Sequence, residues 1–189
     1  RSIMGSIIKV NEYKDFGNND IMTSDGAGVV TPNATGIKNV PAFEAYLSST
    51  QSGVTDATST KVQFDTEVFD TDGCYDNSTN YRFTPTTAGK YHVYFVFVGA
   101  VAGVSRLSQI AGVIRKNGSV YTETSIDNRS DGYGLSSAVT SISTIDMNGS
   151  SDYVECYGYV NDNSGSTVNF YGDAAGTRCV FGAARLIGA

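Results

Sequence analysis

Carboxylates are the most numerous reactive side chains of this sequence, and three of them surround one turn. Asp70, Asp72 and Asp76 flank Gly73 in the segment FDTDGCYD. Oxygen-rich loops of this kind can bind Ca²⁺, but an EF-hand loop also needs a glutamate at its twelfth position, which is missing here. An Asp-Gly turn explains the same letters. The segment leaves a calcium site and an ordinary turn as alternatives, and favours the turn.

Two further loops place acidic residues beside tyrosines. Paired acids can cleave a glycosidic bond only where a cleft fixes their separation. Tyrosine rings can instead stack on sugar faces while Asp and Asn form hydrogen bonds with hydroxyl groups. We predict recognition rather than catalysis, with solvated turns as the open alternative. The candidate ligand-binding residues are Asp127, Asn128, Asp131, Tyr133, Tyr171 and Asp173.

The remaining reactive residues do not form a catalytic or metal-binding pattern. The single histidine, His92, lies inside the β-type run 91–98, where a mobile general base is not expected. Cys74, Cys156 and Cys179 lie far apart without C-x-x-C spacing, and too few histidines accompany them for a zinc site. The sequence therefore predicts a protein that is not an enzyme and needs no cofactor, with calcium as the one alternative.

The composition is that of one β-rich globular domain. The 189 residues include 21 Gly, 12 Tyr and 9 Phe, with only 3 Pro and 17% charged side chains. A net charge of −6, without a cluster of Lys or Arg, removes the electrostatic attraction on which nucleic-acid binding depends. No apolar stretch reaches the length of a membrane span, and no export signal is visible. We expect neither nucleic-acid binding nor membrane insertion.

Short β-type runs separated by turn signals continue from Pro41 to the end of the chain. The pair Asn117-Gly118 between two of them is the strongest hairpin signal, since both central residues of a type I′ turn need positive φ. We predict a head over residues 41–189. Its expected strands are 42–47, 61–64, 81–83, 90–101, 108–116, 120–125, 136–145, 153–160, 167–171 and 178–187.

Residues 1–40 differ from the head and are predicted to form an N-terminal β arm with a linker. Residues 21–31 have two apolar ends around Asp25-Gly26, which is typical of a hairpin. Because an isolated hairpin is only marginally stable in water, this arm must lean on the head or on copies of itself.

Two strands have apolar or aromatic side chains on the face that solvent would normally cover. In the run 153–160, Val154, Cys156, Gly158 and Val160 suit a core, which leaves the tyrosines on the other face. The run 91–98 is apolar on both faces, which indicates that a partner covers one of them. A row covered by the arm, or simply exposed, is the alternative. The predicted interface between copies comprises Tyr91, Val93, Phe95, Phe97, Tyr153, Tyr157 and Tyr159.

The order of blocks from Pro41 to Ile187 resembles the globular head of complement component 1q, which shares its jelly roll with the tumour necrosis factor superfamily. The passage RFTPTTAGKYHVYFVF is similar to the family's F-x-x-P-x-x-G-x-Y pattern, and CVFGAARLI is similar to its closing F-x-G-x-x-L strand. The other matching blocks are PAFEAYLSS, VQFDTEVFDTDGCYD, IRKNGS and AVTSISTIDMNGSSDYVECYGYV.

This resemblance implies an all-β, ten-stranded antiparallel jelly-roll sandwich that forms a homotrimer. It also implies recognition through surface loops and no chemistry. The collagen-like stalk of many animal members is absent upstream of Pro41. The arm, residues 5–33, instead resembles the short β-rich N-terminal segments of bacteriophage tail or fibre proteins.

The expected function is therefore a phage tail or fibre head that attaches to a glycan or protein on the host cell surface. The expected location is the virion, where the arm would bind other virion proteins. The alternatives are a purely structural decoration or trimerisation cap, and a secreted or cell-surface bacterial binding protein.

Overall fold

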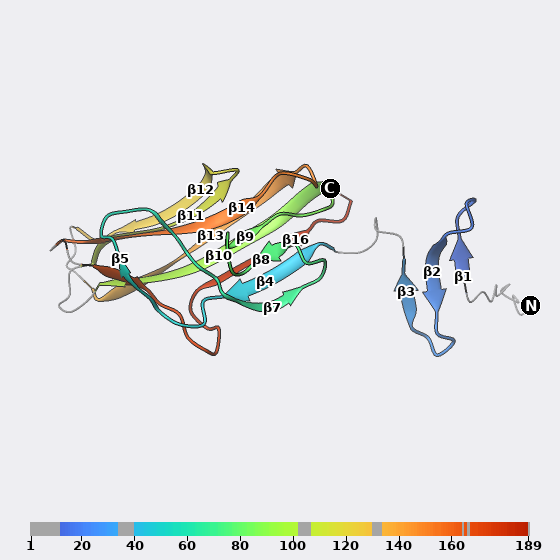
Figure 1. Ribbon diagram of the computed structural model, residues 1–189, viewed down its shortest axis with the longest axis horizontal. Helices are drawn as coiled ribbons and strands as arrows, with labels where there is room; N and C mark the ends of the chain where they lie inside the picture. The colour runs from blue at the N-terminus through green and yellow to red at the C-terminus, as the bar shows by residue number, and fades with distance from the viewer. Residues whose placement is uncertain are drawn as a thin grey trace, which may run out of the picture. The chain divides into compact units, whose positions relative to one another are not determined.

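The computed structural model describes residues 12–33, 40–101, 107–129, 134–163, 165 and 167–188, which form strands and no helix. The chain divides after Asn39 into two compact units, an arm and a head, and Figure 1 shows the strands of both. No segment of the described residues is a helix that could cross a membrane.

The arm is a three-stranded antiparallel sheet in the order β1-β2-β3, formed by Glu12–Lys14, Asp20–Ser24 and Val30–Pro32. Asp25 closes the turn between β2 and β3 because its Oδ1 accepts the backbone N–H of Ala27 at 2.7 Å. The predicted hairpin is thus confirmed. The short strand β1 was not predicted, since three exposed residues carry no apolar pattern.

The head is a sandwich of two antiparallel sheets. The first sheet has the order β5-β15-β10-β16-β4-β7, and β13 also pairs with β10. Its strands are Gln51–Val54, Val168–Phe170, Gly89–Val101, Val180–Arg185, Ala42–Tyr46, Thr66–Asp70 and, for β13, Ser136–Met147.

The second sheet has the order β12-β11-β14-β9-β8, and β6 also pairs with β14. Its strands are Ser119–Asp127, Leu107–Lys116, Val154–Asp162, Arg82–Phe83, Tyr75–Asp76 and, for β6, Thr60–Lys61. Asn117 and Gly118 join β11 to β12 with φ values of 51° and 80°, so the predicted hairpin is confirmed.

The strands β5, β7 and β8 were not predicted. They have two to five residues and no clear alternation of apolar and polar side chains. The expected strand 61–64 was too long: the strand β6 covers only Thr60–Lys61, although the Val62 N–H still donates to the Cys156 carbonyl of β14 at 3.0 Å. The side chains of Val62 and Phe64 are buried in the core.

Aromatic rings fill the space between the two sheets. Phe43 stacks on Tyr75 and on Phe83 at 4.6 Å between ring centroids, and meets the edge of Phe181 at 4.8 Å. All four side chains are buried, which makes this cluster one centre of the hydrophobic core.

The structure also corrects part of the predicted interface between copies. Tyr91, Val93, Phe95 and Phe97 have no exposed surface within a single chain, because the odd-numbered side chains of β10 point between the sheets. They belong to the core of the head and cannot contact another copy.

All three cysteines are free thiols buried in the head. Burial raises the pKa of Cys179 from 9.0 to about 12 and that of Cys156 well above 9.0. The thiols of the folded head are therefore expected to resist a thiol reagent at pH 8 and to react, all three, after denaturation. Rapid labelling of any native thiol would contradict this burial.

The same burial predicts a loss of stability in alkali. The pKa of Tyr91 is also raised by burial, to about 12, so the folded chain binds protons that the unfolded chain releases. These contributions are complete below about pH 9 and disappear as the pH rises toward 12. Circular dichroism during an alkaline titration would measure the effect.

Candidate functional site

A group of apolar side chains lies on the outward face of the first sheet, beside polar residues of β13. The even-numbered residues Tyr94, Val96 and Val98 of β10 are only half-buried in one chain, and of these Val98 also packs against the core. On the neighbouring β13, Ile142 pairs with Tyr94 and keeps 54% of its surface exposed. We call the face formed by Tyr94, Val96, Val98, Ile142 and Val180 the apolar face.

A glycine shapes the middle of the apolar face. Tyr94 lies across Gly182 of β16, and its hydroxyl donates a hydrogen bond to Glu44 of β4. A Cβ on residue 182 would lie 2.2 Å from the tyrosine ring, so only glycine lets the ring lie flat on the sheet. Burial, followed by the bond to Glu44, raises the pKa of Tyr94, which keeps its phenol neutral.

Tyr153, Tyr157 and Tyr159 lie instead on the outward side of the second sheet. The predicted division of β14 is confirmed, because Val154, Cys156 and Val160 are buried and the tyrosines are half-exposed.

Two of these tyrosines contact cationic side chains of the same chain. The guanidinium of Arg115 lies 4.0 Å from the centre of the Tyr157 ring, and that of Arg82 lies 4.5 Å from the Tyr153 ring. The tyrosine row lies on the outward side of the second sheet, whereas the β10 members of the predicted interface set are buried between the sheets, so that set does not form one continuous surface.

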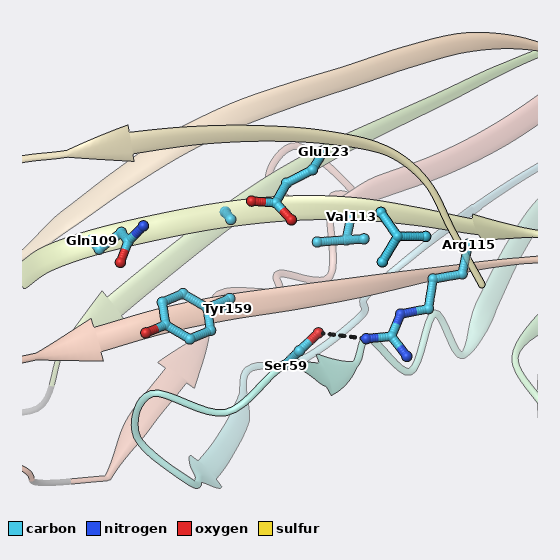
Figure 2. A pocket seen from close by; sticks show the side chains of 8 residues that line it. Ser59, Gln109, Val113, Arg115, Glu123 and Tyr159 are labelled. Atoms are coloured by element: carbon cyan, nitrogen blue, oxygen red, sulfur yellow. Dashed lines mark hydrogen bonds between the residues drawn. The ribbon is translucent and has the colours of Figure 1, made fainter. Parts of the chain in front are cut away.

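A groove crosses the outward side of the second sheet beside the tyrosine row. Ser59, Gln109, Val113, Arg115, Glu123 and Tyr159 are among the residues that line it, as Figure 2 shows. The volume of this cavity is about 290 Å³. We call it the β11 groove. Its floor is Ala111 and Val113, small side chains that leave room above the strand.

Sequence reasoning missed the β11 groove. The pattern that could have revealed it is the series of outward side chains on the strand Leu107–Lys116. In this series the small residues Ala111 and Val113 stand between Gln109 and Arg115. A purely solvated face would carry larger polar residues at such positions.

Two of the predicted ligand-binding residues border a second cavity of about 350 Å³, which we call the loop cavity. Tyr171 and Asp173 line it together with Thr50 and Arg178. The Arg178 Nε lies 3.3 Å from the Asp173 Oδ2, and its guanidinium lies 5.3 Å from the centre of the Tyr171 ring. The Thr177 side chain and the Arg178 charge help to lower the pKa of Asp173.

The other predicted ligand-binding loop is only partly described. Asp127 is exposed and forms an ion pair with Arg129, whose hydrogen bonds lower the pKa of Asp127 to about 2. Asn128 is half-buried. Asp131 and Tyr133 lie outside the described residues.

The carboxylates around Gly73 are used inside the chain. The Asp70 carboxylate accepts the backbone N–H groups of Asp72 and Tyr75. Asp76 accepts those of Thr79 and neighbouring residues, which lowers its pKa. Within the described ranges, no three His, Cys, Asp or Glu side chains gather in a way that could hold a metal ion.

The comparisons with known proteins establish the fold. No family model and no curated protein matches the chain. The globular domain of zebrafish complement 1qA is similar over 76% of this chain and 94% of its own, with 13% identity and a TM-score of 0.52.

Two further solved structures agree. The TNF Eiger of S. frugiperda is similar over 80% of this chain and 96% of its own, with 10% identity and a TM-score of 0.54. Murine APRIL at pH 5.0 is similar over 77% of this chain and 98% of its own, with 11% identity and a TM-score of 0.53. The all-β head therefore has the jelly-roll fold of complement component 1q and tumour necrosis factor domains.

Proposed function

We propose that this chain is a non-enzymatic binding module whose heads associate as a homotrimer and attach to a glycan or protein on a cell surface. The apolar face carries the proposal. An exposed group of apolar side chains on a monomer can mark an interface, and a sheet face that met only water would carry polar side chains at those positions. The fold supports a trimer, since the jelly-roll resemblance implies assembly around a threefold axis.

The loop cavity is the proposed attachment site. Tyr171 offers a ring on which a sugar or apolar group can stack, and Asp173 and Arg178 offer hydrogen bonds at the same edge. Three such cavities held in one trimer would bind a surface far more firmly than one, because the second and third contacts form at high effective concentration.

Replacing Tyr171 with Ala tests this site. The labelled variant should bind host cells about tenfold or more weakly, since each of three weak contacts is lost. It should also bind more weakly to those glycans on an array that the wild type binds. Tyr121→Ala removes a tyrosine that is 48% exposed on the second sheet and should change nothing. Equal binding by wild type and Tyr171→Ala would exclude the loop cavity.

A phage tail or fibre is the proposed setting, with the arm attached to other virion proteins. This rests on the likeness of residues 5–33 to the β-rich segments of such proteins. Deletion of the arm should then leave head trimers intact and release them from the particle. The second candidate, a purely structural cap, predicts trimers that bind no cell and no glycan.

A further inference from the structure

The β11 groove contains a cation that the chain leaves only partly satisfied. The guanidinium of Arg115 makes one hydrogen bond among the described residues, from Nη2 to the Ser59 Oγ at 3.2 Å, as Figure 2 shows. Its Nε is buried and has no hydrogen-bond partner within the described ranges of the chain. Buried polar groups are nearly always paired, so this donor favours a partner beyond those that the described residues supply.

The geometry of Arg115 indicates what that partner is. Nε and Nη2 share one edge of the planar guanidinium, and a carboxylate can accept both N–H groups of that edge at once. Tyr157 lies against the face of the same guanidinium and holds its plane. Ser59 is exposed, and its neutral hydroxyl accepts a hydrogen bond from the Nη2 end of this edge. A carboxylate can displace that hydroxyl.

The rest of the β11 groove suits a sugar ring. Ala111 and Val113 form a small apolar floor, and Tyr159 contributes a ring at one side. Gln109 and Glu123 stand away from Arg115 and can exchange hydrogen bonds with hydroxyl groups. A purely apolar acid would cover the Glu123 carboxylate without giving it a donor, which costs free energy.

We infer that the β11 groove is a second ligand site, which binds a sugar that carries a carboxylate, such as a hexuronic acid. The Arg115 fork binds the carboxylate, the floor contacts the ring, and Glu123 and Gln109 bind its hydroxyl groups. A volume of about 290 Å³ accommodates one such ring. The groove lies on the second sheet and is complete within one chain, so this site does not depend on the proposed trimer or on the loop cavity.

Titration of the ¹⁵N-labelled full chain with sodium glucuronate tests the assignment. Backbone resonances of β11 and β14 should shift to saturation with a Kd of about 1 mM, which is typical of a single small ligand. Glucose, which lacks the carboxylate, and hexanoate, which lacks the hydroxyl groups, should each bind about tenfold more weakly or not at all. Equal binding of hexanoate would overturn the sugar, and equal binding of glucose would overturn the role of Arg115.

Two variants and a control locate the site. Arg115→Gln should weaken glucuronate binding about tenfold or more, since a charge-assisted pair is lost. Ala111→Leu keeps every charge but fills the floor and should also abolish binding. Arg82→Gln removes a guanidinium that also stacks on a tyrosine, outside the groove, and should bind normally. Unchanged binding by Arg115→Gln would refute the proposal.

The same titration separates this inference from the proposed function. Ile142→Glu alters the apolar face on the other sheet and should leave glucuronate binding intact, whatever it does to the association of chains. Tyr171→Ala should likewise leave it intact. Loss of glucuronate binding in either variant would place the ligand elsewhere.

Discussion

Replacing Ile142 with Glu is expected to convert the proposed trimer into single chains of 20.0 kDa. Ile142 is 54% exposed in one chain and lies beside Tyr94 on the apolar face. In a trimer its side chain would be covered, and burying an unpaired carboxylate there costs several kcal/mol at each of three symmetry-related positions. Light scattering coupled to gel filtration would measure the mass directly.

Val120→Glu is the matched control. Val120 is 58% exposed, but it lies on the second sheet, so the same change of charge should leave the mass of the proposed trimer unchanged. Both variants should show native circular dichroism, since each side chain is already in contact with water in the single chain. A wild-type protein that runs as one chain at micromolar concentration would refute the trimer outright.

Replacing Phe43 with Ala is expected to lower the free energy of unfolding by about 3–5 kcal/mol. Phe43 is fully buried and contacts Tyr75, Phe83 and Phe181, so its removal leaves a cavity bounded by rings from both sheets. Because domains of this size have roughly 5–15 kcal/mol in total, the variant should unfold at much lower denaturant. Urea titration in the Ile142→Glu background avoids any dependence on chain concentration.

Tyr75→Phe provides a control in the same cluster. It keeps the ring that stacks on Phe43 and removes only the hydroxyl that donates to the Phe64 carbonyl at 3.0 Å. The expected loss is about 1 kcal/mol, because one buried hydrogen bond disappears. If Phe43→Ala cost no more than Tyr75→Phe, the aromatic cluster would not be a centre of stability.

The long strands of the head could be predicted from the sequence because their patterns are local. Asn117-Gly118 specifies a turn through the φ angles that it tolerates, and alternation in the run 153–160 separates the core side from the outward side. The short strands β5 and β7 lack such patterns, since their pairing with β15 and β4 depends on residues far away in the chain.

The sequence could not show which side chains of β10 face the core, because this strand lacks the alternation that the run 153–160 has. Both of its faces are apolar, so alternation does not reveal which one is the core. Long-range pairing decides it: Tyr94 lies opposite Ile142 on one side and Gly182 on the other, and these pairs turn Phe95 inward. The loop cavity could not be predicted from the sequence either. Residues that could bind a ligand, such as Tyr171, can be picked out in the sequence, but the cavity that Tyr171 and Arg178 line forms only when loops of the folded head meet.

The first and last strands of the head lie side by side in the same sheet. Ala42 of β4 pairs with Ala184 of β16, and the Arg185 N–H donates to the Pro41 carbonyl at 3.3 Å. A unit whose entry and exit points adjoin can be spliced into a surface loop of an unrelated scaffold without stretching either polypeptide. The head is therefore suited to insertion as a complete domain into another protein.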